Sequence, residues 1–95
     1  MQRQSNTVRV RLPALFADRI DGVSTVEVSA TSVADALRAL TDRYAELTTL
    51  VWTGDGALNP LVILFLNDRQ LPRSGVDETV GPGDQLEIIP AIEGG

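Results

Sequence analysis

The sequence predicts an α+β fold, in which a mixed sheet of four to five strands is covered on one face by one main helix. Three observations lead to this prediction. Residues 7–12 and 23–30 alternate between apolar and polar side chains, as half-buried strands do. Residues 33–44 carry apolar side chains at helical spacing. Residues 61–66 and 85–90 are short, apolar-rich runs typical of buried strands. At 95 residues the chain has room for one small domain, residues 1–95, with a single core.

The first two strands form an antiparallel pair in this prediction. Within residues 7–12, Val8, Val10 and Leu12 share one face, and the polar side chains share the other. The turn-forming pair Asp21-Gly22 precedes the second run, whose alternation over residues 23–30 is weaker. We therefore expect a β-hairpin.

The one segment with a convincing helical pattern follows this hairpin. Ser32 is a suitable N-cap, and Asp35, three residues later, is its reciprocal partner. Four side chains recur at helical spacing and are expected to face the sheet: Val33, Leu37, Leu40 and Tyr44. The pattern ends at Leu47, and residues 53–60 are rich in turn formers. We expect a loop there, with Trp52 packed as a lid on the edge of the core.

The apolar run 61–66 predicts a central strand whose alternate side chains face opposite sides of the sheet. Three of them are expected in the core: Val62, Leu64 and Leu66. Ile63 and Phe65 then lie on the outer face. A contiguous apolar patch on an outer face is typical of a docking surface.

The remaining elements follow from turn chemistry. Asn67-Asp68 turns the chain, and residues 69–71 return as a short strand. Residues 77–79 predict one helical turn, and Pro82-Gly83 predicts a tight turn. The last strand is expected to bury two side chains and to present a third beside the outer patch: Leu86 and Ile88 inside, and Ile89 outside.

The predicted order is strand, strand, helix, strand, short strand, strand. With a right-handed crossover, this order closes into the β-grasp, or ubiquitin-like, arrangement. Binding modules, ferredoxins and protein modifiers all share this arrangement, so it does not assign a function by itself.

The residue types that the sequence lacks exclude several functions. It contains no His, Cys or Lys, so the usual zinc ligands, the commonest general base and Schiff-base chemistry are absent, and we expect no metal site. A net charge of −5 argues against nucleic acid as a partner. No run is long and apolar enough to span a membrane, and the first residues lack a secretory signal. We therefore expect a cytoplasmic protein with no membrane partner.

The final residues, 91–95, form a slender tail in this prediction. Because Gly94 and Gly95 have no Cβ, they can enter a channel too narrow for any side chain. Fully extended, residues 91–95 span roughly 17 Å. We expect this flexible tail to present the Gly95 carboxylate to the active site of another protein.

One set of positions in the second half forms a recognisable pattern: residues 62–67, Asp77, Gly83-Asp84, Leu86, Ile88, Pro90 and Gly94-Gly95. This pattern resembles the C-terminal half of the ThiS/MoaD family of ubiquitin-like sulfur-carrier proteins. The first half is similar in pattern alone. The added length at residues 52–60, together with the run Ile89-Pro90-Ala91-Ile92, makes the chain most similar to the CysO-type members of that family.

The resemblance implies that the chain is a protein co-substrate and not an enzyme. An E1-like activating enzyme of the MoeB/ThiF type would use ATP to adenylate the Gly95 carboxylate, and a sulfur source would convert the acyl-adenylate into a thiocarboxylate. Gly94 would allow passage through the enzyme's channel. The chain itself would bind no cofactor. The docking residues would be the outer patch and the tail: Ile63, Phe65, Ile89, Pro90, Ala91, Ile92 and Glu93.

The acceptor of the sulfur stays open at this point. A cysteine-synthase-like enzyme, a molybdopterin-synthase large subunit and a thiazole-synthase-like enzyme are all compatible with the tail, as is the synthesis of a sulfur-containing secondary metabolite. An alternative function is a ubiquitin-like modifier, in which Gly95 is conjugated to lysines of target proteins. A third alternative is a β-grasp interaction domain whose tail is idle.

Overall fold

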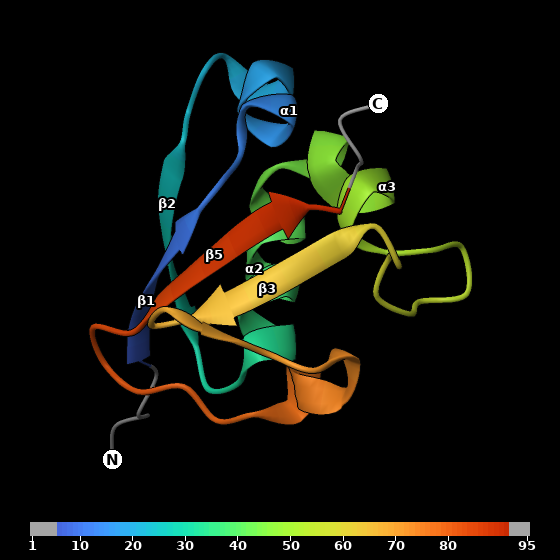
Figure 1. Ribbon diagram of the computed structural model, residues 1–95. Helices are drawn as coiled ribbons and strands as arrows, with labels where there is room; N and C mark the ends of the chain where they lie inside the picture. The colour runs from blue at the N-terminus through green and yellow to red at the C-terminus, as the bar shows by residue number, and fades with distance from the viewer. Residues whose placement is uncertain (1–5, 92–95) are drawn as a thin grey trace.

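The computed structural model describes residues 6–91, which form a five-stranded mixed sheet with the helix α2 packed across one face (Figure 1). The strand order is β2-β1-β5-β3-β4, with β1 and β5 parallel and the other neighbours antiparallel. The predicted β-grasp architecture is confirmed. In chain order, with η for a 3₁₀ helix, the elements are β1 (Asn6–Arg11), α1 (Ala14–Ala17), η1 (Asp18–Ile20), β2 (Thr25–Ala30), α2 (Val33–Arg43), η2 (Ala45–Leu47), α3 (Thr48–Val51), β3 (Val62–Leu66), β4 (Arg69–Gln70), η3 (Arg73–Asp77) and β5 (Gln85–Pro90).

The core lies between the sheet and α2, which runs behind the strands in Figure 1. The strand side chains predicted to be internal are all buried: Val8, Val10, Leu12, Val62, Leu64, Leu66, Leu86 and Ile88. From α2, Val33, Leu37 and Leu40 are completely buried, and Tyr44 at its C-cap is half-buried against the same core. Alternation in the strands and helical spacing in α2 therefore identify one shared apolar interior.

The cap of α2 agrees with the sequence prediction except in one bond. The Ser32 hydroxyl accepts a hydrogen bond from the Asp35 amide at 3.1 Å. The returning bond, however, comes from the amide of Thr31, which donates to the Asp35 carboxylate at 2.9 Å. The reciprocal cap thus ties in the chain one residue before the N-cap, so the turn leading from β2 into the helix is held as well.

The connection between β1 and β2 differs from the expected hairpin. The two strands pair antiparallel as predicted, and Asp21 and Gly22 form the turn with φ of 60° and 82°. Between β1 and that turn, however, the chain forms α1 and η1, which bury Phe16 and Ile20 at one end of the core. β2 consequently begins at Thr25 and not at residue 23.

Between α2 and the predicted loop, residues 45–51 form two short helices that were not predicted. Leu47 in η2 and Val51 in α3 are completely buried, so these two short helices belong to the core. The predicted lid is confirmed, because half-buried Trp52 packs on the core edge and its indole donates a hydrogen bond to the Thr41 hydroxyl at 3.3 Å. The guanidinium of Arg38 lies 5.6 Å from the centre of the Trp52 ring.

In the second half, one predicted element is displaced. The expected helical turn at residues 77–79 is wrong, since the 3₁₀ helix η3 ends at Asp77 and Glu78 instead forms an ion pair with Arg69. The turn at Asn67-Asp68 is confirmed, with φ of 51° and 73°, the left-handed values that a two-residue hairpin loop requires. Within residues 6–91, no helix is long and apolar enough to cross a membrane.

Candidate functional site

The outer patch predicted from the sequence is assembled by two neighbouring strands. β3 and β5 pair antiparallel, and their register places Ile63 directly beside Ile89 and Phe65 beside Glu87. All four side chains lie on the face opposite α2, and Ile63, Phe65 and Ile89 are half-buried. We call Ile63, Phe65 and Ile89 the outer patch. Its apolar surface lies at the end of β5 where the tail begins.

Charged and uncharged polar side chains cover the part of this face that β1 and β2 form. Arg11 on β1 lies beside Glu87 in the parallel β1–β5 pairing. Farther along, Arg9 on β1 pairs with Glu27 on β2 at 3.4 Å, and both side chains are more than half exposed. An ion pair this exposed contributes little to stability. The outer patch is therefore bounded by a polar, charged surface on the side of β1 and β2.

The root of the tail is tied to the sheet. The Ala91 amide donates a hydrogen bond to the Leu61 carbonyl at 2.7 Å, and Pro90 lies opposite Val62. Pro90 has no N–H to donate to a neighbouring strand. Because β1 pairs with β5 only as far as Glu87, no hydrogen bond between β1 and β5 is lost at Pro90. Ala91, the first residue of the predicted tail, is thus hydrogen-bonded. Ile92, Glu93, Gly94 and Gly95 lie outside the described residues.

A polar network anchors the opposite end of β5. Its residues Asn67 and Asp84 entered the sequence prediction only as positions of the family pattern. The Asp84 carboxylate accepts hydrogen bonds from the Gly81 amide at 2.7 Å and from the Asn67 side chain at 3.0 Å. These bonds hold the pKa of Asp84 below its usual range, the Gly81 amide having the larger effect. Asn67 in turn accepts from the Gln85 amide at 2.9 Å. The network connects the β3–β4 turn to the start of β5.

The described residues offer few groups for catalysis. Residues 6–91 contain no cluster of three or more metal-ligating side chains. Within residues 6–91, hydrogen bonds lower the pKa of two carboxylates, Asp55 and Asp84, and in Asp55 the bond from the Thr53 side chain has the largest effect. Neither carboxylate faces the outer patch. What the geometry provides is a stable platform at which an apolar surface and the start of the tail lie together.

Comparison with known proteins assigns this platform to a family. Residues 10–95 match the model of the ThiS family, so the match covers all elements after the start of β1 and continues to Gly95. The chain belongs to the ThiS family. The resemblance seen in the sequence, including the likeness to CysO-type members, is therefore confirmed.

Individual relatives of this ThiS-family chain agree with that assignment. It is 26% identical to a candidate sulfur carrier protein from Archaeoglobus fulgidus, over 93% of this chain and 98% of the relative. SAMP1 from Haloferax volcanii has 28% identity and a TM-score of 0.83, with 95% of this chain and 100% of that chain covered. A chain of the Amycolatopsis orientalis BexX/CysO complex has 26% identity and a TM-score of 0.80, with 93% and 99% covered.

Proposed function

We propose that this chain is a sulfur carrier that holds sulfur as a thiocarboxylate on Gly95. The observation that carries the proposal is the family match, which extends through Gly94 and Gly95 and so includes the predicted tail. The geometry supports it, because the outer patch lies beside the residue from which this tail departs.

The proposed chemistry proceeds in two steps on the partner's side. An E1-like enzyme of the MoeB/ThiF type binds ATP, and the Gly95 carboxylate attacks the α-phosphate, which releases pyrophosphate and leaves an acyl-adenylate. A sulfur nucleophile then attacks the acyl carbon, and AMP departs as the leaving group. This chain supplies an unhindered carboxylate, since Gly94 and Gly95 have no side chains to obstruct the approach.

The outer patch has the role of a docking surface in this proposal. Ile63, Phe65 and Ile89 give the activating enzyme, and afterwards the sulfur acceptor, an apolar contact next to the tail. The two partners would bind in turn, because the same surface serves both. The sulfur would enter the synthesis of cysteine, molybdopterin, thiamin or a secondary metabolite, according to the acceptor. The proposal sets the process in the cytoplasm, where ATP is available to the activating enzyme.

The proposal is tested by blocking the tail. The protein is incubated with ATP, its cognate activating enzyme and a sulfide source, and its intact mass is measured. We expect a product in which one oxygen is replaced by sulfur. A variant with a tryptophan added after Gly95 should give none, whereas a control with the same residue added before Met1 should react normally. Unchanged sulfur loading of the blocked variant would overturn the proposal.

A second candidate function is protein modification. It is favoured by one observation, the 28% identity to SAMP1, a small archaeal modifier protein, over 95% of this chain. In that case the activated Gly95 would form an isopeptide bond with a lysine of a target. High-molecular-weight conjugates that form in cells and disappear when Gly94 and Gly95 are deleted would support the modifier. Formation of the thiocarboxylate product without such conjugates would support the carrier.

A further inference from the structure

Leu61 is the most exposed large apolar side chain in residues 6–91. It lies directly before β3, and 54% of its surface is accessible to solvent. A single exposed leucine is common on protein surfaces and implies nothing by itself. Leu61 differs because its backbone is held in place and because the tail begins beside it. Both features bear on how an enzyme can approach the tail.

Hydrogen bonds fix the backbone of Leu61 on both sides. Its amide donates to the side-chain oxygen of Asn59 at 2.9 Å, and its carbonyl accepts from the Ala91 amide at 2.7 Å. Pro60, between Asn59 and Leu61, has a restricted φ. Leu61 therefore presents an exposed apolar side chain on a rigid backbone, and a partner that buries this side chain has little backbone freedom to remove.

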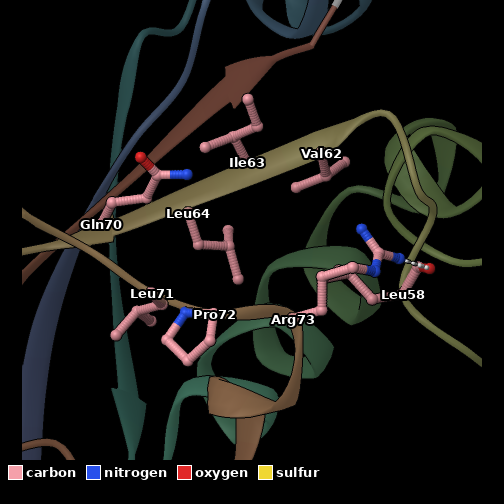
Figure 2. A pocket seen from close by; sticks show the side chains of 8 residues that line it. All are labelled: Leu58, Val62, Ile63, Leu64, Gln70, Leu71, Pro72 and Arg73. Atoms are coloured by element: carbon pink, nitrogen blue, oxygen red, sulfur yellow. Dashed lines mark hydrogen bonds between the residues drawn. The ribbon is translucent and has the colours of Figure 1, made fainter.

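Asn59 orders the turn that leads to Leu61. Its amide donates to the Val51 carbonyl at 2.8 Å, and its own carbonyl accepts from the Val62 amide at 3.0 Å. The preceding residue, Leu58, lines a small pocket at the edge of β3, where its carbonyl accepts a hydrogen bond from the Arg73 guanidinium at 3.4 Å (Figure 2). The segment before β3 is thus attached both to α3 and to η3.

The side chain of Leu61 extends the outer patch towards the tail. The alternation along this stretch buries Val62 and Leu64, so Leu61 lies on the same side as Ile63. Figure 2 shows Ile63 and Leu64 pointing to opposite sides of β3. In the register of β3 and β5, Leu61 falls opposite Ala91, with their Cα atoms about 5 Å apart. Leu61 is therefore the apolar side chain of this row that lies at the root of the tail.

This position decides which surface of an enzyme Leu61 meets. In the proposed reaction the tail enters a channel of the activating enzyme, and Gly95 is the fourth residue after Ala91. The mouth of the channel therefore lies near Ala91, and the rim of the mouth covers the end of the sheet where Leu61 is exposed. A rim that is apolar at this point would bury the exposed part of the leucine side chain.

We propose that Leu61 is the main docking residue for the activating enzyme that adenylates Gly95. The enzyme presents an apolar hollow at the mouth of its channel, and the exposed part of Leu61 fills it. The inference rests on the proposed function and adds to it the residue that holds the complex together. Leu61 touches neither ATP nor the reacting carboxylate, so it is a positioning residue that sets the affinity of the complex and not the rate of the chemical step.

The test measures adenylation by the cognate activating enzyme, by pyrophosphate exchange, at a series of concentrations of this chain. Leu61→Ser removes the apolar contact and keeps both backbone hydrogen bonds. We expect KM to rise about five- to tenfold with kcat unchanged, because roughly half of a leucine side chain is no longer buried. Leu61→Met keeps the apolar volume and should return KM to within about twofold of wild type.

Two further comparisons isolate the effect. Val76→Ser shortens a half-buried apolar side chain in η3, which lies well away from the end of β5, and should leave KM unchanged (Figure 1). Asn59→Asp keeps a side-chain acceptor for the Leu61 amide, whereas Asn59→Leu removes it. KM should therefore be about two- to fivefold higher for Asn59→Leu than for Asn59→Asp. Circular dichroism checks that each variant is folded.

The outcomes separate this inference from the function on which it rests. If wild type is adenylated, three results overturn the docking role alone: an unchanged KM for Leu61→Ser, a loss in kcat with KM unchanged, or an equal rise in KM for Val76→Ser. If wild type is not adenylated by the cognate enzyme, the proposed function is wrong and the docking role is overturned with it.

Discussion

The anchor at the start of β5 gives the most detailed prediction. Asp84→Asn keeps the size and one acceptor of the side chain but removes the charge from its bonds to the Gly81 amide and the Asn67 side chain. Hydrogen bonds to charged groups stabilise folded proteins by roughly 1.5–3 kcal/mol, and solvent access at this half-exposed site reduces that gain. We expect the free energy of unfolding at pH 7 to fall by about 1 kcal/mol.

The pH dependence of this effect has a definite sign. The pKa of Asp84 is lower in the folded state than in the unfolded chain, because the Gly81 amide and Asn67 favour the charged form. The stabilisation is complete above the unfolded-state pKa and disappears as the pH falls through the lower, folded-state pKa. The difference between wild type and Asp84→Asn should therefore be largest at neutral pH and shrink in acid.

Urea unfolding followed by circular dichroism measures this difference. The curves are compared at pH 7 and at about pH 3, below the usual aspartate pKa of about 3.9. Asp42→Asn, on the exposed side of α2, is the matched control and should stay within about 0.5 kcal/mol of wild type. Equal stability of Asp84→Asn and wild type at neutral pH would refute the role of this anchor, as would a difference that is the same at both pH values.

Three further outcomes follow from the packing and the backbone. Ile63→Asp places a charge in the proposed apolar contact, so it should lower the rate of adenylation by the cognate activating enzyme about tenfold or more. Pyrophosphate exchange measures this rate. The control Thr25→Asp, on the polar part of the same face, should leave the rate unchanged. Leu37→Ala, at a completely buried position, should lower the free energy of unfolding by about 2–5 kcal/mol in urea titrations; a smaller loss would mean that the core rearranges around the cavity. Gly83→Ala should cost about 1–2 kcal/mol because its φ is +83°, while Gly54→Ala, equally unobstructed and without a positive φ, should change thermal stability little.

Much of the fold could be predicted because its strands and main helix have clear periodicity. The alternation around Val8 and Val10 identified a strand and its buried face, and the wholly apolar run around Leu64 identified a central strand. The short helices escaped prediction, since four residues such as those of α1 are too few to show a helical period. Phe16 and Ile20 are nevertheless large apolar residues four apart, and this spacing was the available signal.

The candidate site was predictable to a different extent. The outward direction of Ile63 and Ile89 follows from alternation, but their direct pairing depends on the register of two strands far apart in the sequence.

The hydrogen bond from Ala91 to Leu61 also limits the geometry of any enzyme that acts on Gly95. It fixes Ala91, the last residue that the structure describes, and the four residues 92–95 lead from there to the proposed reactive carboxylate. Even fully stretched, these cover at most about 14 Å. For the proposed reaction, a catalytic centre that acts on the Gly95 carboxylate must therefore come within that distance of the end of the sheet, unless the hydrogen bond between Ala91 and Leu61 breaks.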